Sequence, residues 1–124
     1  MKEAVIVLGH GSRREEANDE VREMAKLLGE SIREIPCKAA FLSFGSPDLE
    51  AITEELFREG VKRVYVAPFF LVTGNHIKED IPREISRQQE RHPEMDFNLI
   101  SHLGPHPQLA GLISEKIKEA RNTA

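Results

Sequence analysis

The sequence has few of the residues that build disulfides, zinc clusters or aromatic platforms. It contains one cysteine, one tyrosine and no tryptophan. A single cysteine excludes an intrachain disulfide and a Cys-x-x-Cys zinc cluster. Cys37 precedes an apolar run, which favours a small core residue over a nucleophile. Aromatic residues make up only 6% of the chain, and this argues against a platform on which nucleic-acid bases stack.

Charge and hydropathy exclude two further classes of partner. Lys and Arg number 17 against 21 Asp and Glu, so the net charge is −4. A mildly acidic chain is a poor candidate for binding nucleic acid or an anionic membrane. The first apolar run, Ala4–Leu8, is too short for a signal peptide and far below the ~20 residues of a membrane span. We therefore expect a cytoplasmic protein.

Four apolar runs alternate with four amphipathic stretches. The runs cover Ala4–Leu8, Cys37–Phe44, Val64–Val72 and Phe97–Ile100, and their nearly unbroken apolar content is typical of parallel strands covered on both faces. The stretches carry apolar residues at the three- and four-residue spacing of helices. The order βαβαβαβα predicts one α/β domain over residues 1–124. Its open, mostly parallel four-stranded sheet would have helices on both faces and the flavodoxin-like strand order 2-1-3-4.

Local signals predict where two of the helices begin and end. Ser46 is expected to cap the second helix, with Pro47 at its first position and Gly60 at its end. Pro82 is expected near the first turn of the third helix, because a proline deeper inside would break it. His92 lies in a polar segment, where we expect a solvated side chain.

The segment after the first run carries a histidine between two glycines. Ligands of such sheets lie beyond the carboxyl ends of the strands, where Gly9–Arg14 is placed. The glycines permit a tight turn that leaves His10 uncrowded. His10 is then a candidate metal ligand, base or phosphoryl acceptor, and the structural alternative is a hydrogen bond to a loop carbonyl. Arg13 and Arg14 are candidates for binding carboxylates at the rim.

The segment after the third run carries a second histidine, His76, at the start of a helix. The first and third strands would be neighbours, so His10 and His76 can converge. Two imidazoles with open positions suit Co²⁺, Ni²⁺, Fe²⁺ or Zn²⁺, held loosely enough for transfer. Glu79 and Asp80 follow, either as acid/base helpers or as acids that favour the helix dipole.

Phenylalanines gather at two of the strand ends. Most are expected in the core, and the last of them could wall an apolar pocket for a flat ligand: Phe41, Phe44, Phe69 and Phe70. After the fourth run, His102 and His106 are weaker candidates for ligand contact. His106 also precedes Pro107, where it could simply start the last helix.

Three segments together resemble the short, single-domain form of the CbiX/SirB class II chelatases. They are Gly-His-Gly-Ser-Arg at 9–13, Pro-Phe-Phe-Leu-Val-Thr-Gly-Asn-His-Ile-Lys-Glu-Asp-Ile-Pro at 68–82 and Leu-Gly-Pro-His-Pro at 103–107. The resemblance runs from about Val5 to Leu109. It implies insertion of Co²⁺, or else Ni²⁺ or Fe²⁺, into sirohydrochlorin for cobalamin- or sirohaem-type biosynthesis. It also implies a homodimer with no organic cofactor, and His10 and His76 as the metal-binding, catalytic pair.

The substrate is expected to contact the loops around this pair. The expected contacts are Gly9, Gly11, Ser12, Arg13, Arg14, Ser43, Phe44, Phe70, Leu71, Val72, Thr73, Gly74 and Asn75. Ser43 departs from the family, because many relatives carry an acidic residue at the end of the second strand. Any role of that acid would pass to Glu79, Asp80 or water.

The chemistry agrees with these residues, since neutral imidazoles can hold a metal and accept pyrrole protons near pH 7. Two alternatives stay open at this point. One is a non-catalytic metal or tetrapyrrole carrier. The other, less favoured, is a phosphoryl-transfer enzyme with His10 as nucleophile beside Arg13 and Arg14, although such sites need several converging basic groups.

Overall fold

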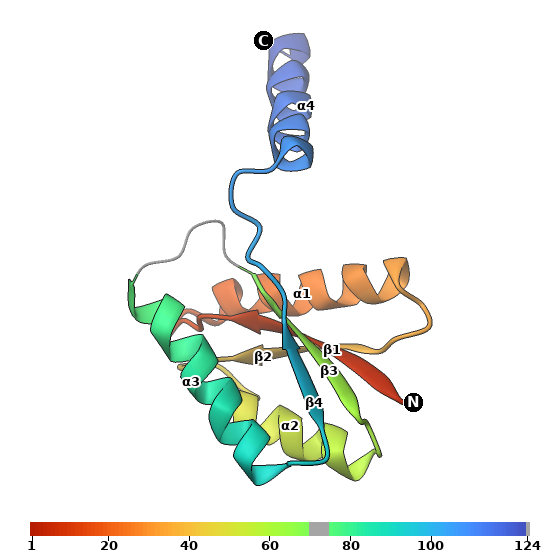
Figure 1. The fold of residues 1–124 in the computed structure, drawn as a ribbon. Helices are drawn as coiled ribbons and strands as arrows, with labels where there is room; N and C mark the ends of the chain where they lie inside the picture. The colour runs from red at the N-terminus through yellow and green to blue at the C-terminus, as the bar shows by residue number, and fades with distance from the viewer. Residues whose placement is uncertain (70–74, 124) are drawn as a thin grey trace.

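The computed structural model of the chain describes residues 1–69 and 75–123, the side chains of residues 75–77 and 123 excepted. Strands and helices alternate as predicted: β1 (Glu3–Gly9), α1 (Glu15–Ser31), β2 (Cys37–Phe41), α2 (Leu49–Arg58), β3 (Arg63–Pro68), α3 (Asn75–Arg91), β4 (Asp96–Leu99) and α4 (Pro107–Thr123). Figure 1 shows α1 over one face of the sheet, α2 and α3 over the other, and α4 standing clear of both.

The strand order is β2-β1-β3-β4, and the three strand pairs are parallel, which confirms the predicted sheet. In this register Leu8 pairs with Ala40 on one side and with Pro68 on the other. The carboxyl ends of β1, β2 and β3 therefore lie at one edge. The Phe69 N–H extends the pairing by donating to the Leu8 carbonyl at 2.8 Å, so the chain leaves β3 beside Gly9.

The two faces of the sheet are covered unequally. Along β3, Val64 and Val66 point towards α2 and α3 and are fully buried, whereas Tyr65 and Ala67 point towards α1 and are half-buried. The larger core lies on the α2–α3 side and consists of Ala4, Ile6, Leu8, Ala40, Leu49, Ile52, Leu56, Val61, Val64, Val66, Ile81 and Met95. On the α1 side the buried cluster is smaller and consists of Val5, Val7 and Ala25.

The start of α2 differs from the prediction. Asp48, not Ser46, is the N-cap, and its side chain accepts a hydrogen bond from Ala51 N at 2.8 Å. Pro47 lies outside the helix because its carbonyl accepts a hydrogen bond from Phe41 N at 3.0 Å. That contact holds the chain alongside β2 and delays the helix to Leu49. Gly60 follows the end of α2 with φ of 84°, which confirms the predicted terminator.

The prediction for Pro82 was wrong. It lies well inside α3, which begins at Asn75, and not in the first turn. A proline there removes one backbone hydrogen bond. Its neighbour Ile81 is buried in the core and Ile85 packs against it, so tertiary packing outweighs the local cost.

Two strands end earlier than their apolar runs. β2 stops at Phe41, not Phe44, because Phe44 adopts φ of 54°, which a strand residue does not. β3 stops at Pro68, and not at Val72 as predicted. Residues 70–74 of that run lie outside the described residues.

His92 is buried rather than solvated, so this prediction was also wrong. It is 5% exposed, its Nε2 lies 2.9 Å from Glu54 Oε1, and its ring lies 4.6 Å from that of Phe57. The polar residues around His92 indicated an exposed segment, but the end of α3 packs against α2. Cys37, in contrast, is half-buried in the α1-side cluster as expected, and burial raises the pKa of its thiol.

The predicted last helix is present, but it does not cover the sheet. Of the α4 residues with described side chains, Leu109 is half-buried and the others are exposed. Within the described parts of the chain, we find no helix with the length and apolar character that crossing a membrane demands.

Candidate functional site

The β1–α1 loop begins with a close approach between two loops. Gly11 has φ of 97°, and a Cβ built on it would lie 1.4 Å from the Ser43 carbonyl oxygen. Only glycine fits such a position, since both the backbone conformation and the space exclude a side chain. The glycine after His10 therefore serves to seat the β1–α1 loop directly on the β2–α2 loop.

Hydrogen bonds fasten these two loops together. The Leu42 N–H donates to the Gly9 carbonyl at 3.0 Å, and the Ser43 N–H donates to the His10 carbonyl at 3.1 Å. The Ser43 hydroxyl also lies 3.4 Å from the His10 carbonyl oxygen. Ser43, singled out as the departure from the family pattern, is thus in direct contact with the His10 backbone.

The His10 side chain is exposed at the carboxyl edge of the sheet. Its Nδ1 lies 3.3 Å from the Gly11 carbonyl oxygen. This is the hydrogen bond to a loop carbonyl that the sequence offered as the structural alternative for His10. This hydrogen bond is compatible with a role of His10 as a metal ligand or base. An imidazole that donates its Nδ1–H to a carbonyl carries its lone pair on Nε2, the form that binds metals and accepts protons.

Asn18 on α1 organises both loops, and the sequence reasoning missed it. It is 1% exposed, and its Oδ1 accepts from Ser12 N at 2.9 Å. Its Nδ2 donates to the carbonyls of Ser12 at 2.8 Å and Phe44 at 3.2 Å. The available signal was its spacing, because Asn18, Val21 and Ala25 share the inner face of α1. A polar residue on that face must find buried partners.

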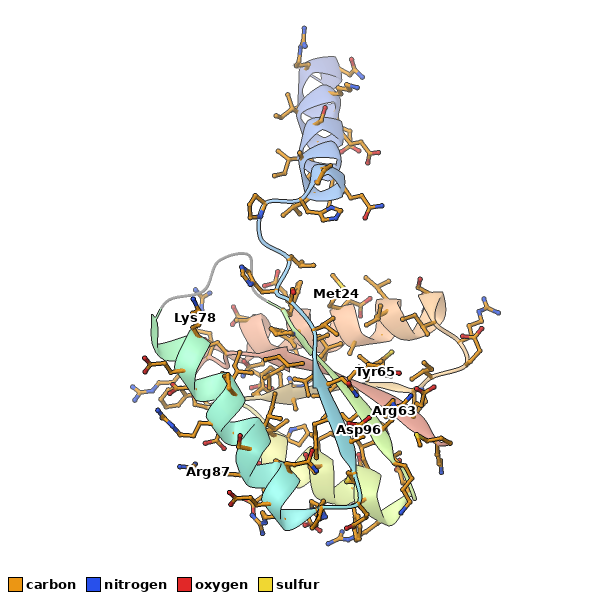
Figure 2. All side chains as sticks on the ribbon, in the orientation of Figure 1. Met24, Arg63, Tyr65, Lys78, Arg87 and Asp96 are labelled. Carbon is orange, nitrogen blue, oxygen red and sulfur yellow. The ribbon has the colours of Figure 1, made fainter. Side chains whose placement is uncertain are left out.

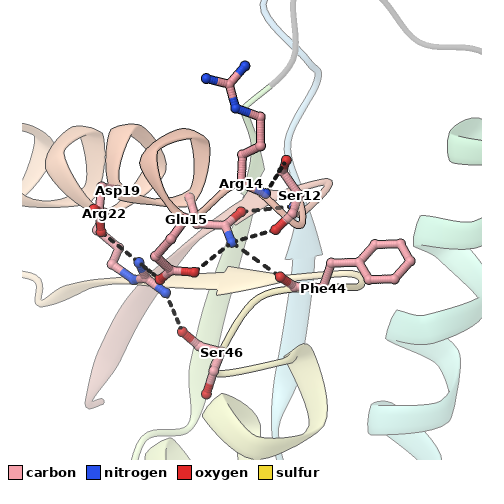
Figure 3. A network of polar contacts seen from close by, with 8 residues as sticks. Ser12, Arg14, Glu15, Asp19, Arg22, Phe44 and Ser46 are labelled. Carbon is pink, nitrogen blue, oxygen red and sulfur yellow. Dashed lines mark hydrogen bonds and ion pairs between the residues drawn. The ribbon is translucent and has the colours of Figure 1, made fainter.

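Arg22 provides a second fastening from the same helix. Figure 3 shows its guanidinium reaching Glu15, Asp19 and the Ser46 carbonyl, the last at 3.0 Å. The Arg22 guanidinium also holds the pKa of the Glu15 carboxyl below its usual range. Together with Asn18, this network anchors the loops of β1 and β2 to the first turns of α1.

The rim beside His10 combines a cation with an aromatic ring. The Arg13 guanidinium lies 4.8 Å from the centroid of the Phe44 ring, and Phe44 is 59% exposed. Phe44 is therefore not a core residue, and its expected contact with the substrate stays a prediction. Arg14 instead pairs with Glu16 at 3.0 Å, where both side chains are largely exposed. Arg13 and Phe44 together form a flat, partly apolar surface with a positive charge.

Much of the loop between β3 and α3 lies outside the described residues. This covers Phe70, Leu71, Val72, Thr73 and Gly74, and also the side chains of Asn75 and His76. The backbone places His76 in the first turn of α3, beyond the strand that neighbours β1. Convergence of His10 and His76 stays a prediction.

Glu79 and Asp80, the predicted acid/base helpers on α3, have different surroundings. Glu79 is exposed, whereas Asp80 accepts a hydrogen bond from Arg83 at 3.2 Å. Their helper role also stays a prediction.

A cavity of about 230 Å³ opens at the carboxyl ends of β3 and β4, beside the start of α3. Its polar lining residues are Lys78, Ser101 and His102, and the rest of its wall is apolar. His106 lies apart from it, where Nδ1 accepts from Gln108 N at 3.1 Å and so caps α4. Among the described side chains, no group of three His, Cys, Asp or Glu could hold a metal ion.

The described part of the site is exposed to solvent at His10, Arg13 and Phe44. It offers an exposed imidazole, an exposed aromatic ring and a nearby guanidinium on anchored loops. Such an edge can accept a wide, flat ligand that carries negative charge. It suits phosphoryl transfer poorly, because Arg13 lies over Phe44 and Arg14 pairs with Glu16 rather than converging on His10.

Comparisons with known proteins find similarity along most of the chain. The family model described as CbiX matches residues 4–120. The chain is 31% identical, over 94% of its length, to a sirohydrochlorin ferrochelatase of Priestia megaterium, of which it covers 44%. It is 25% identical, over 96% of its length, to a sirohydrochlorin cobaltochelatase of Methanosarcina barkeri, of which it covers 97%.

A solved structure shares the fold. It is a CbiX protein, described with cobalamin (vitamin B12) biosynthesis, from Marinobacter aquaeolei VT8. The TM-score is 0.87 at 27% identity, covering 98% of this chain and 99% of that one. The chain spans about half or less of four curated relatives, between 38% and 52% of their length.

Proposed function

The chain belongs to the CbiX family, and from that premise we propose that it inserts a divalent metal ion into sirohydrochlorin. The observation that carries the proposal is the match of the family model to residues 4–120, which spans the elements from β1 into α4. The relatives bear both cobaltochelatase and ferrochelatase names. We propose Co²⁺ as the preferred substrate ion, with Ni²⁺ and Fe²⁺ as alternatives.

In this proposal His10 and His76 hold the metal ion before transfer. Exposure of the His10 ring and the carbonyl contact at its Nδ1 support a free electron pair on Nε2. A two-histidine site holds a metal loosely, which suits a protein that must release it into a macrocycle.

Insertion also removes two protons from pyrrole nitrogens, and these protons need acceptors. The metal ion enters the macrocycle, two N–H bonds break, and both protons leave the substrate. A neutral imidazole can take such a proton near pH 7. Glu79 and Asp80, in the first turns of α3, are the proposed helpers that pass protons to water.

The substrate would lie across the anchored loops. The Arg13 guanidinium would pair with a substrate carboxylate, and the flat macrocycle would pack on the exposed Phe44 ring. The backbone around Gly9, Gly11, Ser12 and Ser43 forms the floor beneath it, and Arg14 stands at the rim. Contacts of the substrate with Phe70, Leu71, Val72, Thr73, Gly74 and Asn75 stay predictions from the sequence.

We further propose that residues 1–124 act as one chelatase domain and that two copies associate. The relatives support this, because the chain covers 97% of the Methanosarcina barkeri protein and 44% of the Priestia megaterium protein.

The test is an anaerobic absorbance assay with sirohydrochlorin in excess over protein. Co²⁺, Ni²⁺ and Fe²⁺ are supplied separately to the unaltered protein, His10→Ala and His76→Ala. We expect several turnovers per protein with at least one metal, and a loss of about 10²–10⁴-fold in each variant. The rate ranking among the three ions identifies the substrate metal.

His106→Ala is the matched control, because His106 lies near the same edge but only caps α4. It should retain the rate of the unaltered protein. Binding of sirohydrochlorin with at most one turnover would replace the chelatase proposal with a carrier. Full activity in a protein with both His10 and His76 changed to alanine would remove the proposed metal pair.

A further inference from the structure

The cavity at the carboxyl ends of β3 and β4 combines apolar walls with three polar side chains. Its apolar lining residues are Pro68, Ile81, Pro82, Leu99 and Ile100, and its polar ones are Lys78, Ser101 and His102. None of these described lining residues is acidic. Apolar walls with a few polar groups are the usual composition of a ligand site. The cavity therefore suits a group that is aliphatic along its length and negative at its end.

Two of the polar side chains have hydrogen-bond donors to spare. Figure 2 shows Lys78 at the carboxyl edge of the sheet, in the first turns of α3. Within the part of the chain that the structure describes, neither the Lys78 ammonium nor the His102 ring has a hydrogen-bond or ion-pair partner. Glu79 follows Lys78, but adjacent helical residues point in different directions, and Glu79 does not line the cavity. A carboxylate only accepts hydrogen bonds, so it would satisfy these donors.

The backbone after β4 keeps the His102 ring at the cavity. The Ile100 N–H donates to the Val66 carbonyl at 3.0 Å, so the chain stays paired with β3 one residue beyond β4. Gly104 is buried and has φ of 52°, and a Cβ built on it would lie 3.3 Å from His102 Nε2. A side chain there would crowd the ring, so the glycine allows the ring to lie close to the backbone. This close packing limits the positions that the half-buried ring can take.

The volume and place of the cavity limit what it can hold. A water molecule takes up about 30 Å³ in the liquid, so the cavity of about 230 Å³ has room for roughly seven or eight such volumes. That is enough for a short aliphatic carboxylate but less than the roughly 300–1,000 Å³ of sites that enclose a whole ligand. Neighbouring strands lie about 4.8 Å apart, so β4 is about 10 Å from β1, which ends at the His10 loop. The cavity is therefore beside the candidate site and too small for a macrocycle.

We propose that this cavity holds one carboxylate-bearing arm of the tetrapyrrole substrate, with Lys78 and His102 donating hydrogen bonds to the carboxylate. The assignment rests on the proposed function, and it gives the substrate a second anchor besides Arg13. One anchor alone leaves a flat macrocycle free to turn about that contact. Two separate anchors fix its rotation over His10, and they favour a tetrapyrrole with acidic arms over one with esterified or uncharged arms.

The first test measures binding of metal-free sirohydrochlorin to the full chain by absorbance titration. Lys78→Gln should raise the Kd by about 5- to 10-fold, because a charge-assisted hydrogen bond to a partly exposed carboxylate is lost. Lys78→Arg keeps a cationic donor and should stay within about threefold of the unaltered protein. In the metal-insertion assay, the loss in Lys78→Gln should fall on KM more than on kcat, since the arm is held before and during the reaction.

Lys62→Gln is the matched control. Lys62 is also exposed, but it precedes β3 and so lies at the opposite, amino edge of the sheet. This variant loses the same charge and should bind sirohydrochlorin with unchanged Kd. Circular dichroism verifies that all variants are folded. An unchanged Kd in folded Lys78→Gln, or an equal rise in Lys62→Gln, would overturn the assignment.

The second test needs no tetrapyrrole. Sodium propionate is titrated into the full chain while NMR records the methyl signals of Ile81 and Ile100, with sodium chloride at equal ionic strength as the reference. We expect saturable shifts with propionate alone, lost in Lys78→Gln and kept in Lys62→Gln. No shift, or the same shift with chloride, would overturn the carboxylate site.

The two tests separate this assignment from the proposed function. Propionate binding by a protein that neither binds sirohydrochlorin nor inserts metal would reject the proposed function and leave a carboxylate site for another acid. Metal insertion with unchanged Kd and KM in Lys78→Gln would reject the carboxylate site and leave the proposed function in place.

Discussion

The α2–α3 side of the sheet and the carboxyl edge use the same strands for opposite purposes. On the α2–α3 side, apolar residues of three strands and two helices are closed off from water. At the edge, His10, Arg13 and Phe44 are exposed, and backbone and amide hydrogen bonds hold their loops. Stability and chemistry are therefore separated in space, and substitutions in the two regions should have separable effects.

The largest effect on stability is expected on the closed side. Leu56 is fully buried there, and Leu56→Ala should lower the free energy of unfolding by about 2–5 kcal/mol through lost burial and a residual cavity. Urea unfolding measures this change. His10→Ala should change the free energy of unfolding by no more than about 0.5 kcal/mol, because surface substitutions away from packed features are nearly neutral. Equal losses in the two variants would contradict the separation.

Asn18 is a buried residue of α1 that holds two loops of the carboxyl edge. Asn18→Ala should cost about 1–3 kcal/mol, because it leaves buried hydrogen-bonding groups of Ser12 and Phe44 unpaired. It should also slow metal insertion per folded molecule, since both loops lose their anchor. Asp19→Ala is the neighbouring control. It removes only an exposed ion pair to Arg22 and should change stability by less than about 1 kcal/mol. An Asn18→Ala protein with unchanged turnover would limit this residue to a structural role.

A smaller effect distinguishes the structural cap of α2 from the predicted one. Asp48→Ala should destabilise the protein by about 0.5–2 kcal/mol, because Ala51 N loses its acceptor. Ser46→Ala should be nearly neutral, since α2 begins three residues later and the Ser46 contact to Arg22 uses its backbone carbonyl. Thermal unfolding of both variants compares them directly. If Ser46→Ala destabilised the protein more than Asp48→Ala, Ser46 would be the cap, as the sequence predicted.

The smallest effect concerns Cys37 on the α1 side. Burial raises the pKa of its thiol, so the thiolate forms at higher pH in the folded than in the unfolded chain. The resulting contribution to stability is present below the unfolded pKa and is lost as pH rises through the folded pKa. Modification by a thiol reagent should therefore be slower in the folded protein at pH 8 than in urea. Equal rates would show that the thiol is not shielded.

The sequence was sufficient for the strand and helix order and for the position of His10. Both follow from repeated local patterns: apolar runs, helical spacing, and a glycine-flanked histidine after a strand. It was insufficient for His92 and Pro82, because each depends on a packing partner far away along the chain. The contact between His92 and Glu54 joins α3 to α2, and no local pattern reports it.

The candidate site also contains residues that the sequence alone indicates and residues whose role only the folded structure reveals. Residue types that bind metals and carboxylates can be recognised along the chain, and so His10 and Arg13 were named as candidates. The structure exposes both side chains at the carboxyl edge, and their roles stay predictions. Asn18 was missed because its role consists of hydrogen bonds to two different loops, which meet only after the sheet has formed.

Composition and periodicity along this chain were enough to establish an α/β sheet, its parallel strands and the end at which chemistry-bearing residues collect. These properties follow from the local preference of each segment and the handedness of its connections. The loop anchoring by Asn18, the burial of His92 and the unpaired side of α4 required the folded molecule. Each depends on contacts, or on missing contacts, between segments that are far apart in the sequence. Local sequence patterns do not report such contacts.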